Sequence, residues 1–442
     1  MRNALKKIPS IVYIVRNARL FMGWGNRNLP GLFKYFLIFK VNLIHKRYKK
    51  VLIQKKIKLL EGKKIRVVFF VSQKQLWGSQ SLYEELNSND YFDALVVVFP
   101  NNEDKINKKS LTMKGNYDFF LDQDINVVNG YDLDNNSYFP ASSFNPDIVF
   151  YDQPVPHIHK SLLWLNLSKN SLICYIPYGY KIAPFYQDHF NLFLHNSSWH
   201  IFAESDWHKK QFIKYGSMNG RNVSVSGYPK LDEYNNVTEF ENRDFKRIIW
   251  APHWSVLNSN IGYSTFDENY KFFLKYASEN PDIHWVFKPH QRLRYYLEEI
   301  GFMTKEEIDN YYDQWDKLPN AIFYNEANYI NIFKDSDALI TDCGSFLAEY
   351  LPTKNPILHL ISKNNQGYNK IGKSLVESYY QATNINLIGK FIKEVVIEEN
   401  DFLKDKRLLN LKFVQPNSEG AGQFIVDYLQ SQLVEEIEIV DE

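Results

Sequence analysis

The chain has few cysteines, no long apolar run, and no acidic residue in its first 60 positions. Its 442 residues include two cysteines, Cys174 and Cys343, which lie far apart in sequence and match no metal-binding spacing. We therefore expect a protein of a reducing cytoplasm that needs no disulfide framework. No run approaches the roughly 18 apolar residues that span a bilayer. The short apolar run after Lys7 also leads to no small-residue cleavage site of a signal peptide.

The missing acidic residues make the charge distribution uneven. Of the 52 Lys and Arg residues, 15 fall within residues 1–60, which leaves 37 against 51 acidic residues in the rest of the chain. Aromatic and aliphatic residues such as Ile8, Phe21 and Trp24 are interleaved with these cations. This composition is typical of segments that lie in the interface of anionic membranes, so we expect peripheral membrane attachment. A basic helix packed on the acidic body or on another subunit is the alternative. The aliphatic content argues against nucleic acid as a partner.

Length and pattern predict two α/β domains. A chain of 442 residues is too long for one ordinary core, and apolar runs alternate with helical patterns, as in doubly wound sheets. We predict four parts: a basic amphipathic segment over residues 1–60, a Rossmann-like domain over 61–235, a second over 236–415, and a C-terminal helix with an acidic tail over 416–442.

Short apolar runs bounded by turn residues predict buried parallel strands. In the first domain these runs are residues 65–72, 94–99, 147–151, 172–176 and 199–203. In the second domain they are residues 247–251, 283–288, 321–324, 338–341 and 357–361. Helical patterns occur at residues 46–58, 79–87, 158–167, 207–215, 269–278, 292–300, 305–312 and 420–433.

Four loops at the carboxyl ends of the second-domain strands carry polar residues. The first loop contains His253, and the third is the polar stretch near Asn325 and Glu326. The second contains Lys288, His290 and Arg292, and the fourth contains Asp342, Gly344 and Ser345. Carboxyl ends of parallel strands meet in one crevice, so we expect these loops to share a site.

The four loops offer cations, hydrogen-bond donors and backbone amides, which suit a diphosphate. Gly344 and Ser345 lie where a strand gives way to a short predicted helix, residues 346–351, so their amides and the helix dipole favour an anion. Alternatively, Asp342 and Ser345 simply cap that helix. Glu349 could accept hydrogen bonds from a ribose or polyol, or lie exposed. Similarly, the cations can be ordinary surface residues and the histidines ordinary loop residues that bind no ligand.

Four motifs in order resemble those of the CDP-glycerol glycerophosphotransferases, which build teichoic acids and related capsular polymers. The motifs are SGYPKLDEY (226–234), IIWAPHWS (248–255), VFKPH (286–290) and DALITDCGSFLAEYL (337–351), and the resemblance covers about residues 147–361. It implies two Rossmann-like domains that face a cleft in the GT-B arrangement, with a basic head at the cytoplasmic face of the bacterial cell membrane. It places His290 at the donor-phosphate histidine and Glu349 at the family's acidic position. Gly344 and Ser345 fall at its phosphate-turn pair, more usually Ser-Ser.

The sequence departs from this family at the expected proton acceptor. The family usually has a histidine before a glycine in the first domain, whereas here Tyr178 precedes Gly179. A neutral tyrosine with a pKa near 10 is a poor base. His157 and Asp152 are the nearest substitutes, and otherwise the acceptor chemistry differs. His157 can also be an ordinary loop histidine.

The leading hypothesis is an enzyme of EC 2.7.8 type. It would transfer a polyol phosphate, glycerol phosphate above all, from a CDP-linked donor to a hydroxyl of a lipid-linked or polymeric glycan and release CMP. No Asp-x-Asp pair falls in the four loops, so no metal ligands are predicted and no cofactor is required, although a divalent ion is compatible. An inverting glycosyltransferase that uses a nucleotide sugar fits the same architecture. A non-catalytic scaffold of a polymer-export complex is the third hypothesis. A homo-oligomer is compatible with all three.

Overall fold

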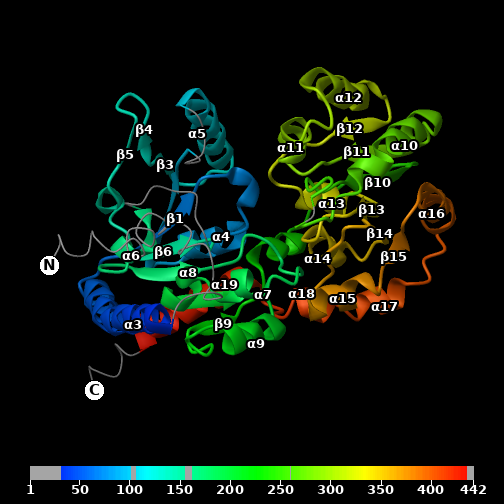
Figure 1. Ribbon diagram of the computed structural model, residues 1–442. Coiled ribbons are helices and arrows are strands. Elements are labelled where there is room, and N and C mark those ends of the chain that lie inside the picture. The colour runs from blue at the N-terminus through cyan, green and yellow to red at the C-terminus, as the bar shows by residue number, and fades with distance from the viewer. Residues whose placement is uncertain (1–30, 101–105, 155–161, 259, 436–442) are drawn as a thin grey trace. The chain divides into compact units, whose positions relative to one another are not determined.

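The protein consists of two compact domains, shown in Figure 1 as a computed structural model that describes residues 31–100, 106–154, 162–258 and 260–435. The first domain comprises Met1–Gly179, Phe185–Asp232 and Pro416–Glu442, and the second comprises Tyr180–Pro184 and Glu233–Gln415. The chain therefore passes between the domains four times. The C-terminal segment, which the sequence analysis sets apart, belongs to the first domain.

The first domain is built on a parallel sheet with the strand order β3-β2-β1-β6-β7-β8-β9. These strands are β1 (Ile65–Val71), β2 (Phe92–Val98), β3 (Val127–Asn129), β6 (Ile148–Tyr151), β7 (Leu172–Tyr175), β8 (His200–Ala203) and β9 (Val223–Val225). The central strands read as nearly continuous apolar runs because both faces of the sheet are covered. Phe69 of β1 pairs in register with Val96 of β2 and Phe150 of β6. A separate hairpin consists of β4 (Tyr131–Asp132) and β5 (Ser137–Tyr138).

Helices from both ends of the chain complete the first domain. They are α3 (Gly31–Leu60), α4 (Gln80–Ser88), α5 (Ile106–Leu121), α6 (Trp164–Leu167), α7 (Tyr186–Phe190), α8 (Phe193–Ser197), α9 (Asp206–Tyr215) and α19 (Ala421–Gln430), the last continued by a π-helix, Ser431–Glu435. α19 packs against α4 so closely that a Cβ at Gly422 would lie 2.8 Å from the carbonyl carbon of Ser81. The Asp232 carboxylate accepts the amides of Ala421 and Gly422 at 2.9 and 2.8 Å, which fixes the start of α19.

α3 is an integral part of the first domain and is longer than the helix predicted over residues 46–58. One face of α3 is buried, with Tyr48 2% exposed and donating its hydroxyl to the Ser197 carbonyl at 2.9 Å. The ammonium group of Lys55 lies 2.8 Å from the Asp147 carboxylate. The described part of the basic head therefore packs on the body of the protein, which is the alternative given in the sequence analysis. Membrane attachment stays a prediction. No helix among the described residues is both long and apolar enough to cross a bilayer.

α3 also carries a second apolar face. Among its residues 38–60, whose side chains the structure describes, five large apolar side chains are exposed: Phe39, Leu43, Ile53, Ile57 and Leu60. At 3.6 residues per turn they fall on the side of the helix opposite Tyr48. The helix thus has two apolar faces, one packed on the sheet domain and one exposed among lysines.

The second domain is a six-stranded parallel sheet with the order β12-β11-β10-β13-β14-β15. Its strands are β10 (Lys246–Ala251), β11 (Ile283–Phe287), β12 (Ala321–Phe323), β13 (Ala338–Thr341), β14 (Ile357–Leu360) and β15 (Tyr380–Ala382). Numbered in chain order this is 3-2-1-4-5-6, the order of a Rossmann domain, and it reverses between β10 and β13. The first domain has the same reversal between β1 and β6.

Helices and an aromatic cluster fill the second domain. Trp250 of β10 stacks on Phe273 and Phe287 with ring centroids 4.3 and 5.1 Å apart. The helices are α10 (Phe266–Glu279), α11 (Leu293–Glu299), α12 (Lys305–Lys317), α13 (Ile330–Lys334), α14 (Phe346–Glu349), α15 (Lys370–Val376), α16 (Ile385–Lys390), α17 (Lys404–Leu408) and α18 (Leu411–Val414). A π-helix, Phe391–Ile397, continues α16. Four short 3₁₀ segments occur among the described residues: Lys74–Leu76, Ala141–Phe144, Pro229–Asn235 and Leu351–Thr353.

The two parallel sheets confirm the predicted fold class of two Rossmann-like α/β domains. All ten predicted strands are present within a residue or two. The sequence analysis misses β3, β9 and β15, which are three-residue strands at sheet edges, and the β4–β5 hairpin. It also extends the helix after Ser345 to residue 351, whereas α14 ends at Glu349.

The two faces of α3 predict contrasting mutational effects. Tyr48→Ala should destabilise the first domain by about 3–5 kcal/mol, because it removes a buried aromatic ring. Ile53→Ala should cost less than about 0.5 kcal/mol, because Ile53 is 58% exposed on the other face. Urea denaturation of the two variants measures the difference, and equal midpoints would show that α3 is not part of the core.

Candidate functional site

The point at which the strand order reverses marks the candidate site in the second domain. Ligands of open α/β sheets bind outside the carboxyl ends of the strands at such a reversal. Here the reversal lies between β10 and β13, so the loops that follow these strands, residues 252–265 and 342–345, border it. β11, next to β10, ends just before Lys288 and His290. Four of the predicted residues, His253, His290, Gly344 and Ser345, thus come from three adjacent strand ends.

Asp342 holds the loop after β10 in place. Its buried carboxylate accepts the His253 amide at 2.5 Å, and the amide and hydroxyl of Thr265 at 2.6 and 2.8 Å. Burial raises the pKa of Asp342 to about 7, while the three hydrogen bonds act in the opposite direction. These contacts give Asp342 a positioning role in the loop after β10, and its predicted place in a ligand site stays a prediction.

His253 is fixed as a neutral hydrogen-bond donor. Its Nδ1 accepts the Ser255 amide at 3.2 Å and lies 2.8 Å from the Ser255 hydroxyl. That hydroxyl itself accepts the Tyr263 amide at 3.1 Å, so it donates its proton to Nδ1. This pattern assigns the ring proton of His253 to Nε2. Burial, and then the neighbouring His290, hold the pKa of His253 well below its usual value.

His290 has a matching arrangement. Its Nδ1 accepts the Arg292 amide at 3.1 Å, and its own amide donates to the Pro252 carbonyl at 2.9 Å. The rings of His290 and His253 have centroids 5.3 Å apart. Burial, with the charges of Lys288 and Arg292, lowers the pKa of His290 to about 4. Two neutral imidazoles thus lie side by side, each with the proton on Nε2.

The turn after β13 adds backbone donors. Neither the Gly344 nor the Ser345 amide donates to another of the residues that the structure describes, and both residues are partly exposed. A Cβ added at Gly344 would meet only Ile182 and Tyr263, at ordinary contact distances of 3.7 and 3.8 Å. Because a side chain would fit there, the glycine is not needed for packing. The turn can supply two amides to an anion.

Lys288 and Glu349 are joined through a tyrosine. The Lys288 ammonium group donates to the Glu326 carbonyl at 3.3 Å and lies 4.9 Å from the centroid of the Tyr329 ring. The Tyr329 hydroxyl donates to the Glu349 carboxylate, which also accepts the Tyr180 amide at 3.4 Å. Glu349 is 1% exposed, so it is not a surface residue. The Tyr329 side chain thus contacts an ammonium group with its ring face and a carboxylate with its hydroxyl.

Arg292 lies at the rim of the site. Its guanidinium carbon is 4.2 Å from the centroid of the Trp254 ring, a cation–π contact. Its side chain is 52% exposed and reaches Glu299 at 3.8 Å. Because exposed pairs of this kind hold weakly, Arg292 can turn toward a ligand at little cost.

The remaining predicted residues belong to the first domain. Asp152 follows β6, and desolvation raises its pKa to about 7. Tyr178 follows β7 and is 46% exposed, and desolvation of its hydroxyl and the charge of Asp152 raise its pKa above the usual 10. A third group, which the sequence analysis misses, follows β8: Ser205 bonds the Nδ1 of His208 at 2.8 Å. His157 lies outside the described residues.

The sequence analysis also misses three positioning residues of the second domain: Ser255, Thr265 and Tyr329. The role of Ser255 could be predicted from the local sequence, since a serine two residues after a histidine can form a hydrogen bond with its ring. The role of Thr265 could not be predicted in this way, because its partner Asp342 is 77 residues away. Among the described residues, no group of three or more His, Cys, Asp or Glu side chains is placed to hold a metal ion.

Known proteins resemble this chain in structure and not in sequence. No protein-family model matches it, and no curated protein matches it by sequence. The wall teichoic acid polymerase TagF soaked with CDPG superposes with a TM-score of 0.56 at 15% identity, covering 90% of this chain and 98% of the other. The UDP-GlcNAc 2-epimerase from Neisseria meningitidis bound to UDP-GlcNAc gives 0.54 at 14% identity, covering 83% and 100%. At these identities the likeness shows the fold alone, which is GT-B-like.

The two neutral histidines predict that anion binding takes up protons. A bound diphosphate raises the pKa of His290 above about 4, its value without ligand, and the added proton occupies Nδ1 in place of the hydrogen bond from the Arg292 amide. Affinity should therefore rise as the pH falls from 8 to 5, by up to about tenfold per pH unit for each proton taken up. His290→Ala should lower the affinity at pH 6 by roughly tenfold or more and flatten the profile. Calorimetry with a CDP diester, which does not itself titrate in this range, measures both.

His284→Ala is the matched control, because His284 lies in the same domain near the opposite, amino end of β11. If this variant lost as much affinity as His290→Ala, or if the wild-type profile were flat, the paired histidines would not be the anion site.

Proposed function

We propose that the protein is a transferase that moves a polyol phosphate, glycerol phosphate above all, from a CDP-linked donor to a hydroxyl of a membrane-associated polymer or glycolipid. The observation that carries this proposal is the array of uncharged donors at the strand reversal of the second domain: His253, His290, and the amides of Gly344 and Ser345. Such an array suits a diphosphate. The fold shared with a teichoic acid polymerase supports the broader class, a transferase of cell-surface polymers.

The reaction needs charge neutralisation and alignment more than covalent chemistry. The acceptor oxygen attacks the phosphorus of the polyol phosphate, the bond from that phosphorus to the bridging oxygen breaks, and CMP leaves with the electron pair. His253 and His290 donate hydrogen bonds to the diphosphate through Nε2 and so stabilise the charge that develops on the leaving phosphate. Lys288 and Arg292 add positive charge close by.

The proton of the acceptor hydroxyl needs a base, which we assign to Asp152. A carboxyl group with a pKa of about 7 is half ionised at neutral pH and can take up a proton. Tyr178 is unsuited to this role, because its raised pKa keeps it protonated. A role of His157 as the base, the other possibility that the sequence offers, remains a prediction.

The basic head would attach the proposed enzyme to a membrane surface. The described part of the head, α3, leaves Phe39, Leu43, Ile53, Ile57 and Leu60 exposed among lysines. A surface of this kind favours an anionic interface. Peripheral attachment to the cytoplasmic face of the cell membrane would bring the enzyme to a lipid-linked acceptor.

The alternative is an inverting glycosyltransferase or related enzyme that acts on a nucleotide sugar. The likeness to a UDP-GlcNAc 2-epimerase bound to UDP-GlcNAc favours it, because the same fold there holds a nucleotide sugar. The diphosphate array would serve either donor, and the two functions differ in the bond that breaks.

A donor screen separates the two functions. CDP-glycerol, CDP-ribitol and UDP-GlcNAc are each incubated with the full chain and detergent-solubilised lipid-linked acceptor, and CMP, CDP and UDP are quantified. We expect CMP from a CDP-polyol, with kcat lowered about 10²–10³-fold in His290→Ala and unchanged in His284→Ala. Release of UDP would favour the alternative, and three intact donors would favour a scaffold.

The assignment of Asp152 predicts the pH profile of the reaction. With saturating donor, the rate should rise with pH through about 7, because the carboxyl group must lose its proton before it can act as a base. Asp152→Asn should lose about 10²–10⁴-fold in kcat and the rising limb together, while the affinity for donor stays unchanged. A rising limb that survived in Asp152→Asn would assign the base to another residue.

A further inference from the structure

The first domain contains a pocket of about 590 Å³ beside α3. Its walls include Trp199 and His200 at the start of β8, and Asn222 just before β9. These positions are at the amino ends of the strands, whereas Asp152 and Tyr178 follow the carboxyl ends of β6 and β7. The pocket is therefore separate from the candidate catalytic groups of the same domain.

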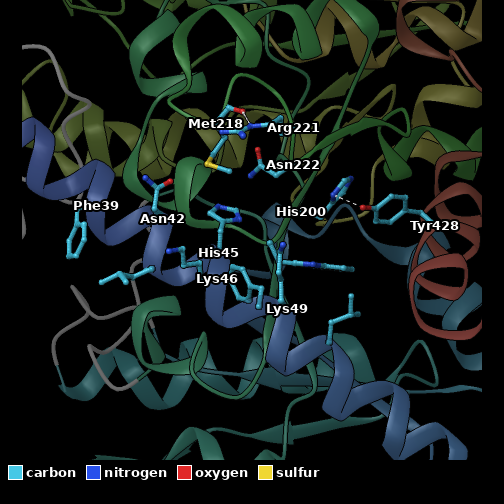
Figure 2. Close-up of a pocket in the computed structure, with 14 residues that line it drawn as sticks. Phe39, Asn42, His45, Lys46, Lys49, His200, Met218, Arg221, Asn222 and Tyr428 are labelled. Atoms are coloured by element: carbon cyan, nitrogen blue, oxygen red, sulfur yellow. Dashed lines mark hydrogen bonds between the residues drawn. The ribbon is translucent and has the colours of Figure 1, made fainter. Parts of the chain in front are cut away.

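The pocket has excess positive charge and no acidic residue. Figure 2 shows Lys46 and Lys49 on α3, with Arg221 across the pocket from them. All three are exposed, and none forms an ion pair with an acidic residue in the described part of the chain. Since unpaired cations gathered at one opening attract an anion, this opening suits a phosphate group.

The polar groups deeper in the pocket already have partners. The Nε2 of His45 lies 2.9 Å from the Asn196 carbonyl. His200 bonds the Tyr428 hydroxyl at 2.8 Å and the Ser224 hydroxyl at 3.0 Å, and burial lowers its pKa to about 3. His200 is therefore neutral, and both histidines are engaged in hydrogen bonds, so the three exposed cations supply the charge.

Apart from Asn42 and Asn222, the rest of the lining is largely apolar and continues onto the surface. Trp199, Met218 and Leu52 form the walls, while Phe39 and Leu43 lie at the opening and are 59% and 45% exposed. Phe39 and Leu43 also belong to the exposed apolar face of α3. A ligand that matches this pocket carries a phosphate and an apolar chain, because an isolated phosphate would leave the apolar wall unused.

We propose that this pocket binds the headgroup of an anionic phospholipid, with the phosphate at Lys46, Lys49 and Arg221 and the first part of an acyl chain against Phe39 and Leu43. The volume suits such a headgroup, since small-molecule pockets measure about 300–1,000 Å³. The chain's own residues 1–30 are an unsuitable occupant, because they carry six Lys and Arg and no acidic residue. The proposal does not depend on which group the enzyme transfers.

Flotation of the full chain with vesicles tests the charge requirement. Binding to phosphatidylcholine vesicles with 30% phosphatidylglycerol should fall roughly 100-fold in Lys46→Glu/Lys49→Glu/Arg221→Glu, since each cation near an anionic surface contributes about tenfold at most. Lys271→Glu/Lys305→Glu/Lys317→Glu is the control with the same change in net charge, placed on exposed residues of the second domain. Equal losses in the two triple variants would overturn the proposal, since they would show a response to overall charge.

Fluorescence of Trp199 tests entry into the pocket. Soluble short-chain phosphatidylglycerol with brominated chains should quench the protein, and Trp199→Phe should remove that part of the quenching. Glycerol 1-phosphate at the same concentration should not compete; if it did so with equal affinity, the pocket would be a site for soluble phosphates. Quenching unchanged in Trp199→Phe would likewise overturn the proposal.

Donor turnover with a water-soluble acceptor should be the same in both triple variants, which separates this test from the catalytic one.

Discussion

The second domain depends on one buried carboxylate. Asp342 lies at the end of β13 and accepts three hydrogen bonds from the loop that follows β10, so it joins the two strands between which the order reverses. Taking a carboxylate out of water is costly, and three donors offset that cost only while the loop keeps its shape. The shape in turn sets His253, and the Pro252 carbonyl holds the amide of His290. A single side chain thus positions both imidazoles.

The two proposed phosphate sites rest on different physics. His253 and His290 are neutral and desolvated, so their hydrogen bonds act at short range and are little affected by salt. Lys46, Lys49 and Arg221 are exposed charges, which attract an anion over about 8–10 Å and are screened by salt. The neutral histidines suit a catalytic site, because preorganised donors stabilise the charge that develops on a leaving phosphate as a bond breaks. The exposed cations suit reversible capture at a surface.

The sequence predicts what is local and misses what is distant. The strands with continuous apolar runs, such as residues 65–71 and 338–341, were predictable because burial on both faces leaves a pattern in neighbouring residues. β3, β9 and β15 leave no such pattern, since each of these three-residue strands contains a polar residue: Asn129, Ser224 and Gln381. The loops with His253 and His290 were likewise predictable from their position after strands. The roles of Asp342 and Glu349 were not, because Thr265 and Tyr329 lie 77 and 20 residues away from them.

The return of α19 to the first domain has a consequence for how the protein is made. Asp232 holds the start of a helix that begins at Ala421, so a structural element of the first domain leaves the ribosome only after the second domain. At about 5–20 residues per second, the interval between the synthesis of Asp232 and of Ala421 is roughly 10–40 s. During that time the second domain can fold, while the surface of α4 that α19 will cover is open to solvent. A nascent chain of this protein therefore exposes an apolar helix face until α19 has been synthesised, and such a face is a natural target for chaperones.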